Sequence, residues 1–294
     1  MTVDALRRLL DSDQGCDIRL LIRDNGSTDG TAEAIRERFP GVEFDVGTDN
    51  LGFAGGMNRL IERSDAPWFF PLNSDAWPED GCLATLIEAA EACPRAATVA
   101  PLVLRPDGEL EHSTHPFPSP RVAAMMALGS KRWIRRRGDQ LLIEQAWMHD
   151  RRRTVDWAVG AALLMRREAL DDIGPFDERY FMYVEDLEWC WRARQRGWDV
   201  LFEPSAVVRH IGNVSGRARY GRQRTAAYMA NTYRFYADQH GRAAMQVLRA
   251  LNVAGVVRQM AASALARDRE RRAYWRSMVP AYMGRGAPPD PRHS

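Results

Sequence analysis

The chain has 294 residues, of which 45% are hydrophobic and 27% are charged, so it can bury the core of one large domain, or of one domain with a small appendage. Its formal net charge of +2 is close to neutral, and the composition as a whole therefore does not predict a nucleic-acid partner. The four cysteines are scattered without a Cys-x-x-Cys pair, which predicts neither a zinc knuckle nor a disulfide framework and favours a reducing, cytoplasmic environment. The chain lacks a run of about 18 apolar residues and does not open with a basic segment followed by an apolar one, so we expect no membrane-spanning helix or signal peptide.

The first part of the chain alternates predicted strands with predicted helices. Residues 17–23 predict a short, largely apolar strand, and the turn-rich residues 25–30 lead into a helix with apolar residues at helical spacing. The pattern then repeats. Residues 68–72 predict a second strand, although Pro71 weakens this prediction, and residues 83–90 carry the apolar face of the next helix.

Three further apolar segments, residues 97–103, 158–165 and 200–208, predict additional strands. Residues 183–197 predict an amphipathic helix between the last two. Such an alternation is typical of the α/β class, in which helices cover a mostly parallel sheet.

Two stretches depart from this alternation. Residues 116–154 contain several prolines and two arginine-rich runs, and we expect them to form an insertion. From residue 217 onward the composition becomes helical, and the proline-rich end from residue 284 is expected to be disordered. We therefore predict an α/β domain over residues 1–216 and a helical extension with a disordered tail over residues 217–294.

Polar residues that directly follow the apolar segments are candidates for a binding site, because ligands of such sheets bind at the carboxyl ends of the strands. They form five motifs in the order Asp24-Asn-Gly-Ser-Thr-Asp29, Asn50-Leu-Gly-Phe-Ala-Gly-Gly56 with Asn58, Asn73-Ser-Asp75, Gly174-Pro-Phe-Asp-Glu178 running into Tyr183-Val-Glu-Asp186, and His210. In this order the motifs resemble those of the family-2 glycosyltransferases of the GT-A fold, particularly the rhamnosyltransferase-like branch. The resemblance extends from Leu6 to Ser215.

The resemblance implies a GT-A fold, Rossmann-like with a mostly parallel sheet, followed here by a C-terminal helical appendage. It also implies an inverting glycosyltransferase that moves a sugar, with rhamnose favoured, from a dTDP- or UDP-sugar donor to a glycan or polyprenyl-linked acceptor. An inactive sugar-nucleotide- or glycan-binding module derived from the fold is the alternative. A nucleotidyltransferase is a third reading, for which the expected glycine-rich loop near the start is not visible.

Asp75 is the candidate ligand for a divalent metal, Mg²⁺ or Mn²⁺, because two phosphates of a leaving nucleotide diphosphate need their charge neutralised. In the family this position is the last acid of the DxD motif, so Asn73-Ser-Asp75 is a version in which the first acid is an amide. Asn73 can offer a carbonyl to the metal or a hydrogen bond to ribose, and the resemblance implies that His210 contacts metal or diphosphate. From the residues alone, a helix-capping Asp75 and a structural His210 stay open.

The first two loops are candidates for binding the nucleotide sugar. In the family the loop of Asp24 and Asn25 meets the nucleotide base, whose imide edge needs the donor and the acceptor that an asparagine amide supplies. The glycines of the second loop allow close backbone approach. An Asn-Gly turn and an ordinary glycine-rich strand–helix junction explain the same residues. The full set of candidate nucleotide-sugar-binding residues is Asp24, Asn25, Gly52, Gly55, Gly56, Asn58 and Asn73.

Glu185 and Asp186 lie in the first turn of a predicted helix, where acids are ordinary partners of the helix dipole. An inverting transferase, however, needs a carboxylate that takes the proton of the acceptor hydroxyl. The matching acid in the family is the second of the pair, which implies Asp186 as general base and Glu185 as its neighbour in orientation or acceptor binding. Arg192 and Arg209 are candidates for diphosphate contact, with surface salt bridging as the favoured role.

Members of the family begin with an apolar strand that lies centrally in the sheet, and this chain begins after it, because residues 3–10 match the helix that would follow. We therefore expect the first strand to be missing. Its loss leaves backbone groups of neighbouring strands unpaired, which would impair folding or activity.

Positive charge gathers in the run KRWIRRR, residues 131–137, and again at residues 151–153. An aromatic side chain among basic residues suits an anionic lipid surface, a peripheral position at the inner face of the cell membrane and a polyprenyl-linked acceptor. A solvated arginine-rich loop explains the same residues. Nucleic acid is not expected as a partner, because no array of stacking aromatics accompanies the charge.

Overall fold

A computed structural model describes residues 2–128, 149–212 and 220–287 of the chain. They form two compact units. The first contains residues 2–115 and 149–212, and the second contains residues 116–128 and 220–287. The beginning of the predicted insertion thus belongs to the same unit as the C-terminal helices.

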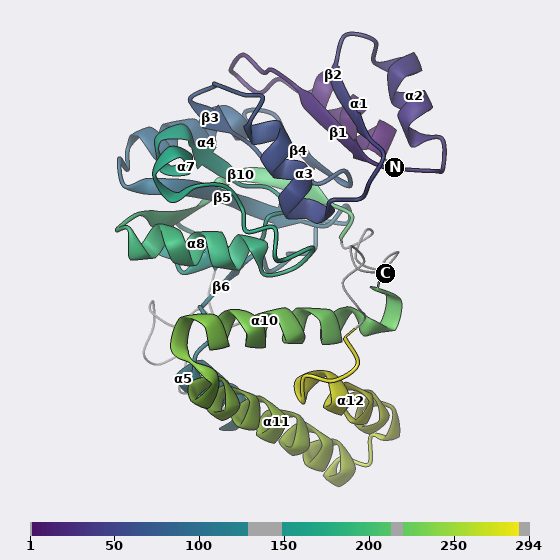
Figure 1. The fold of residues 1–294 in the computed structure, drawn as a ribbon, viewed down its shortest axis with the longest axis vertical. Coiled ribbons are helices and arrows are strands. Elements are labelled where there is room, and N and C mark those ends of the chain that lie inside the picture. The colour runs from purple at the N-terminus through teal and green to yellow at the C-terminus, as the bar shows by residue number, and fades with distance from the viewer. Residues whose placement is uncertain (1, 129–148, 213–219, 288–294) are drawn as a thin grey trace. The chain divides into compact units, whose positions relative to one another are not determined.

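The first unit is built on a six-stranded sheet in the order β3-β9-β5-β10-β4, with β7 also paired to β10 (Figure 1). The strands are β3 (Trp68–Phe69), β4 (Ala76–Pro78), β5 (Ala96–Leu104), β7 (Arg153–Val155), β9 (Leu164–Arg166) and β10 (Asp199–His210). The two longest strands, β5 and β10, run parallel over eight paired residues, and the short strands beside them pair in antiparallel fashion. The predicted α/β class is confirmed, with the parallel pairing at the centre of the sheet.

Three helices pack on the central strands of this sheet and on the segments beside them. They are α4 (Cys82–Glu91), α7 (Arg167–Ile173) and α8 (Glu185–Gln195). The buried side chains of α4 form one apolar cluster with Val99 of β5 and Leu201 of β10. Because successive side chains of a strand point to opposite faces, the buried Val200 and Phe202 face away from α4. The sheet therefore has an apolar core on both faces.

A second sheet consists of β1 (Leu21–Asn25) and β2 (Glu43–Gly47), which run parallel and pair with no other strand in the described residues. The helices along this part of the chain are α1 (Thr2–Asp11), α2 (Thr31–Arg38) and α3 (Gly52–Ile61). Helix α3 packs against β1, and α1 packs against α2 and β4. The prediction that a central strand is missing stays a prediction.

The apolar segment 158–165, predicted as one strand, is two short strands separated by a loop. Strand β8 (Trp157–Ala158) pairs with β6 (Thr114–His115), and β9 begins only at Leu164. Backbone groups of the intervening residues bond to other parts of the molecule, among them the acid pair of α8. The prediction of a continuous strand is wrong, because tertiary contacts satisfy these backbone groups.

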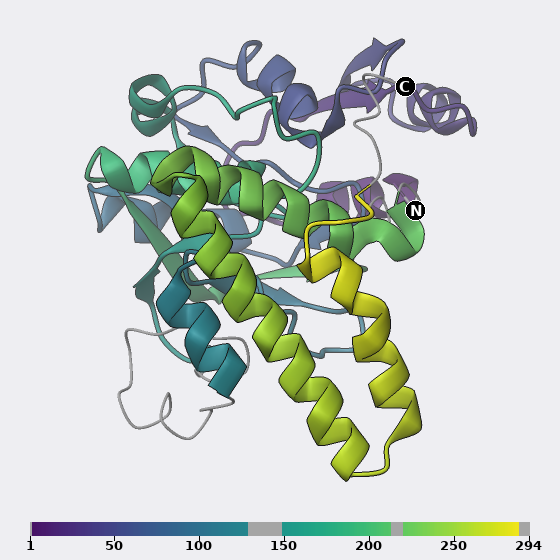
Figure 2. The same cartoon turned by 60° about the horizontal axis from the view of Figure 1, so that its bottom comes forward.

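The second unit is helical. Its elements are α5 (Pro120–Leu128), η2 (Gly221–Gln223), α10 (Arg224–His240), α11 (Arg242–Leu265) and α12 (Arg269–Tyr282). Helices α5 and α12 lie on either side of α11, as Figure 2 shows, and α10 contacts both α11 and α12. These elements confirm the predicted C-terminal helices. The run KRWIRRR and the end of the predicted tail, from residue 288, lie outside the described residues.

Candidate active site

Asn73, Asp75 and His210 are brought together by strand pairing. Ala76 of β4 lies opposite His210, the last residue of β10, so the residue before β4 comes to lie beside the imidazole. Nε2 of His210 is 3.2 Å from Oδ1 of Asp75 and 3.4 Å from Nδ2 of Asn73. The side chains of Asp75 and His210 are both buried. The three residues predicted for the metal end of the site thus form one cluster.

Glu111 holds the other ring nitrogen of His210. Its carboxylate oxygens lie 3.1 and 3.2 Å from Nδ1. Burial opposes a charge on the ring, but the hydrogen bonds and charges of Asp75 and Glu111 outweigh it and raise the pKa of His210 to about 9. Between these carboxylates His210 is protonated at neutral pH, and a metal that binds Nε2 has to displace that proton.

The residues of this cluster fit a divalent metal as part of its ligand set. Oδ1 of Asp75 and Nε2 of His210 face the same small region, and Glu111 orients the imidazole from behind, as carboxylates commonly do for histidine ligands. The described residues contain no group of three or more His, Cys, Asp or Glu side chains arranged to hold a metal. Phosphate and water oxygens would therefore have to supply the remaining ligand positions.

Glu185 and Asp186 form a buried acid pair at the start of α8. Asp186 accepts two backbone hydrogen bonds, Oδ2 from N of Gly160 and Oδ1 from N of Leu187, each at 2.8 Å. Burial raises the pKa of Asp186, and these two bonds oppose the rise. Oε2 of Glu185 is buried without a hydrogen-bond partner in the described part of the chain, and burial followed by the charge of Asp186 holds the pKa of Glu185 well above its ordinary value.

The backbone enters α8 through a strained turn. Tyr183 and Val184 have φ angles of 70° and 81°, in the left-handed region. Non-glycine residues adopt this conformation at a cost of roughly 1–3 kcal/mol, and β-branched ones do so very rarely. Val184 is buried, so packing holds the turn in place. Such strain gathers at functional sites, which agrees with a catalytic role for the acids that follow.

Gly160 joins the acid pair to the metal end of the site. Its N–H donates to Asp186, and the carbonyl of the next residue, Ala161, accepts from N of Asn73 at 3.0 Å. A Cβ at position 160 would lie 3.2 Å from Cε1 of Phe53 and 3.5 Å from Cβ of Asp186. The loop after β8 therefore places a carboxylate that can accept a proton next to a segment that can hold a metal.

Asp24 and Asn25 are tied into the protein at the end of β1. Nδ2 of Asn25 donates to O of Gly52 at 2.9 Å, and its Oδ1 accepts from Nε of Arg23 at 3.1 Å. Asp24 is buried, and its Oδ2 accepts from N of Ser27 at 2.9 Å. The amide of Asn25 thus links β1 to α3, and its predicted contact with the nucleotide base stays a prediction.

The glycines of α3 permit close packing within the protein. Gly52 has a φ of 74°, and a Cβ there would lie 2.1 Å from O of Phe181. A Cβ on Gly55 would lie 2.8 Å from Cβ of Leu51, and one on Gly56 would lie 2.9 Å from Nδ2 of Asn25. Other atoms of the protein therefore approach the backbone closely at these three glycines.

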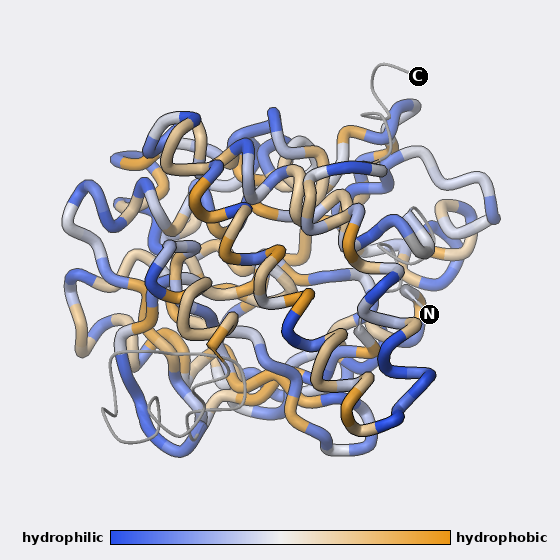
Figure 3. The backbone as a smooth tube through the Cα atoms, turned by 90° about the horizontal axis from the view of Figure 1, so that it is seen from below, coloured by the Kyte–Doolittle hydropathy of each residue, from blue (hydrophilic) through white to orange (hydrophobic). Residues whose placement is uncertain are grey.

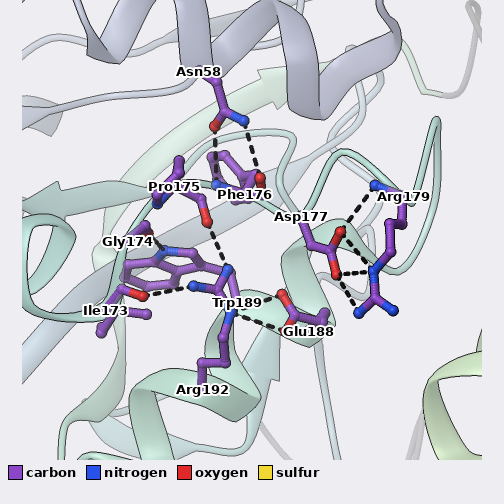
Figure 4. Close-up of polar contacts among 10 residues, drawn as sticks. All are labelled: Asn58, Ile173, Gly174, Pro175, Phe176, Asp177, Arg179, Glu188, Trp189 and Arg192. Carbon is purple, nitrogen blue, oxygen red and sulfur yellow. Dashed lines mark hydrogen bonds and ion pairs between the residues drawn. The ribbon is translucent and has the colours of Figure 1, made fainter. Parts of the chain in front are cut away.

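Asn58 holds residues 174–178 against α3 (Figure 4). Its Nδ2 donates to O of Phe176 at 2.9 Å and to Oε1 of Glu178 at 3.0 Å, and its Oδ1 accepts from N of Phe176 at 2.9 Å. Both amide hydrogens are thus used within the protein. This buried side chain positions a loop, and its predicted contact with the nucleotide sugar stays a prediction.

The candidate arginines are also paired within the protein. Arg192 binds the carboxylate of Glu188 and donates to the carbonyls of Ile173 and Pro175, each at 2.7 Å (Figure 4). Arg209 donates to Glu79 and to O of Arg105. Both arginines have the salt-bridging role that the sequence favoured. Of the basic residues 151–153, Arg152 pairs with Glu203 and Arg153 with Asp150.

Sequence reasoning missed two residues of the site. Gly160 lies in an apolar run, where a glycine within a predicted strand is itself a signal of close backbone approach. Glu111 gave no such signal, because it lies 99 residues from His210 in the chain and only the fold brings the two together.

The α/β architecture and the match to a family model place the chain among the glycosyltransferases with a GT-A fold. The model of glycosyl transferase family 2 matches residues 2–174, which is more than half of the chain. The chain belongs to this family.

Curated relatives and solved structures agree with this assignment. The chain is 35% identical over 235 residues to the N-acetylglucosaminyl-diphospho-decaprenol L-rhamnosyltransferase of Mycobacterium tuberculosis, covering 76% of each chain. It is 29% identical over 210 residues to the pre-mycofactocin glycosyltransferase of the same species, covering 70% of this chain and 39% of that protein. The structure of a mannosyltransferase from Pyrobaculum calidifontis in complex with GDP-Man and Mn²⁺ has a TM-score of 0.50 at 16% identity, covering 96% of this chain and 80% of that one, and shares the fold.

Proposed function

We propose that the chain is an inverting rhamnosyltransferase that moves rhamnose from a dTDP- or UDP-linked donor to a glycan carried on a polyprenyl diphosphate. The M. tuberculosis relative, which by its name acts on N-acetylglucosaminyl-diphospho-decaprenol, supports the sugar and the type of acceptor. The observation that carries the mechanism is the Gly160 loop, which links Asp186 to the Asn73–Asp75 segment by hydrogen bonds of 2.8 and 3.0 Å.

Asp186 acts as general base in this proposal. Two backbone N–H groups fix its carboxylate and favour its charged form, whereas Glu185 has a buried, unpartnered oxygen in the described structure and a strongly raised pKa. Burial raises the pKa of both acids, and the two backbone N–H bonds make Asp186 the member of the pair that more readily carries the charge. Asp186 takes the proton of the acceptor hydroxyl as that oxygen attacks the anomeric carbon, and the bond from this carbon to the nucleotide diphosphate breaks on the opposite side. The sugar is thereby inverted, and Glu185 orients the acceptor.

Asp75 and His210 hold a divalent metal, Mg²⁺ or Mn²⁺, in this proposal, with Asn73 beside them. When bound, such an ion stabilises the charge that develops on the departing diphosphate. The proposed donor-binding residues are those at the ends of β1 and β3, with Asp24 and Asn25 toward the base. Asn58 and the glycines of α3 shape this region by positioning the loops around it.

The test measures transfer from dTDP-rhamnose and from UDP-sugars to a polyprenyl-diphosphate-linked N-acetylglucosamine, with and without Mn²⁺. We expect Asp186→Asn to lower kcat by about 10²–10⁴-fold with donor affinity retained. Asp75→Ala is expected to abolish the metal dependence together with the activity. Asp171→Asn, an exposed acid on α7, is the matched control and leaves kcat unchanged.

Full activity in Asp186→Asn would overturn the assignment of the base. Donor binding by the wild-type chain without any turnover would instead favour an inactive sugar-nucleotide-binding module. The anomeric configuration of the product, read by NMR, decides between inversion and retention.

A further inference from the structure

The second unit carries a charge that the composition of the whole chain conceals. Residues 220–287 contain twelve arginines and three acidic residues, a formal net charge of +9, in a chain whose net charge is +2. The rest of the chain is therefore net negative. Positive charge gathered on one unit favours a partner with a negative surface.

Helix α11 exposes an apolar face along most of its length. Its buried residues, Met245, Leu248, Val256 and Ser263, lie on one side of the helix, and α11 contacts α5, α10 and α12. From position 247 to position 265 every exposed residue is apolar, where a helix facing water normally carries polar side chains. The α11 face, as we call it, consists of Val247, Ala250, Ala254, Val257, Ala261, Ala262, Ala264 and Leu265.

The larger members of this face are strongly exposed. Val247 and Val257 are 52% and 53% exposed, and Leu265, at the end of the helix, is 88% exposed. Apolar side chains gathered on one face in this way mark an interaction surface, whereas single exposed ones do not.

A basic turn follows the α11 face directly. Five exposed arginines lie in this turn and in the part of α12 that follows it, and none of them forms an ion pair in the residues that the structure describes: Arg267, Arg269, Arg271, Arg272 and Arg276. Arg267 has a φ of 55°, a conformation that helix ends normally give to glycine. Tyr274, between the arginines, is 55% exposed. Figure 3 follows the change from the apolar helix to the hydrophilic turn.

We propose that the α11 face and the basic turn dock this protein on the surface of a bilayer that contains anionic lipids. The apolar side chains enter the boundary between head groups and acyl chains, and the arginines and Tyr274 stay at the level of the lipid phosphates. In the described residues no helix is long and apolar enough to cross a membrane.

The charge distribution favours lipid over the other occupants of such a face. Two copies paired through α11 would bring two units of +9 together, and their repulsion opposes the pairing. A nucleic acid would satisfy the arginines and leave the α11 face in water, because this face has no aromatic side chains for bases to stack on. An anionic bilayer satisfies both features.

The test measures co-flotation of the full chain with phosphatidylcholine vesicles and with vesicles that also contain phosphatidylglycerol. We expect binding to the anionic vesicles only, decreasing as salt is added. R269E/R271E/R272E is expected to weaken vesicle binding by about one order of magnitude or more, because three attractions to anionic lipid are lost. R7E/R36E/R38E makes the same change in net charge on exposed residues of the first unit and leaves binding unaffected within about twofold.

A second pair of variants tests the apolar contribution. V257Q/L265Q is expected to weaken vesicle binding severalfold, whereas Leu10→Gln, on an exposed residue of α1, does not. Equal binding to neutral vesicles, or unchanged binding of the arginine variant, would overturn the proposal. A dimer in sedimentation velocity would also overturn it, if V257Q/L265Q dissociates that dimer and leaves vesicle binding intact. Tight binding to duplex DNA without binding to vesicles would overturn it as well. No sugar donor or acceptor enters these measurements, so their outcome is independent of the proposed glycosyl transfer.

Discussion

At the scale of single residues, environment decides the charge of the groups in the site. His210 lies between two carboxylates that raise its pKa to about 9, although its burial acts in the opposite direction. Glu185 and Asp186 are neighbours in the chain, yet one accepts two backbone N–H bonds and the other has a buried oxygen without a partner in the described residues. The two neighbouring acids therefore have different hydrogen-bond environments, although burial raises the pKa of both.

Glu111→Gln is expected to lower the pKa of His210 from about 9 toward the ordinary value of 6.5, because one of the two carboxylates that stabilise the imidazolium is lost. A raised pKa of a histidine stabilises the folded state fully below about 6.5, and this contribution is lost as the pH rises through 9. The difference in unfolding free energy between wild type and variant should therefore be largest below pH 6.5 and disappear above pH 9. NMR titration of the imidazole and urea unfolding at several pH values measure both effects in metal-free protein.

Glu109→Gln is the control for this variant. Glu109 is exposed, pairs with Arg105 and lies two residues from Glu111. An equal pKa of His210 in the two variants would show that Glu111 does not set the charge of the histidine.

At the scale of elements, the site depends on how closely segments approach one another. The loop before α8 lies against α3, where N of Phe53 donates to O of Phe181 at 3.0 Å. Asn58 binds the same loop further along, through three hydrogen bonds. Glycines in α3 make the approach possible, because a Cβ at position 52 would overlap the carbonyl of Phe181.

Gly52→Ala is expected to destabilise the protein by at least about 3 kcal/mol, because it combines left-handed strain with a clash against backbone. Gly30→Ala is the matched control. Gly30 has a similar φ, 82°, but a Cβ there meets no atom within 4 Å, so only the strain of about 1 kcal/mol is expected. Urea unfolding of both variants measures the difference. Equal losses of stability would mean that the loop before α8 yields to the added methyl group.

At the scale of the whole molecule, burial is unevenly distributed between the two units. Strands β5 and β10 are buried along most of their length, whereas α12 has a single buried residue, Ala281. Charge is divided as unevenly, with the basic residues gathered in the helical unit. The first unit thus has the core and the candidate chemistry, and the second has the surface proposed for lipid.

Hydrogen exchange should follow this distribution. We expect the amides of β5 and β10 to exchange most slowly, close to the rate set by global unfolding, and those of α12 to exchange well before them. Mass spectrometry of peptic fragments measures both in one experiment. Slower exchange in α12 than in β5 would contradict the assignment of the stable core to the sheet. Anionic vesicles should slow exchange in α11 and α12 and leave β5 unchanged.

The sequence by itself determined the α/β class, the C-terminal helices and the family. These follow from apolar periodicity and from motifs in a fixed order, which are local properties of the chain. The chemistry of a leaving diphosphate pointed to Asp75, with Asn73 beside it, and the family resemblance added His210; the structure places the three side chains in contact. The high arginine content after residue 220 is also a property of the sequence, but the near-neutral net charge of the whole chain does not reveal it.

Only the tertiary structure decided which hydrogen bonds the candidate polar groups make within the protein. Asn25, Asn58 and Arg192 each have partners that sequence patterns did not reveal. The loop at Gly160 was predicted as part of a strand, and no sequence pattern pointed to Glu111. Sequence patterns record which side chains prefer to be buried. The partner of a buried polar group is set by contacts across the fold. A buried polar group therefore forms its hydrogen bonds with whatever partners those contacts bring near it.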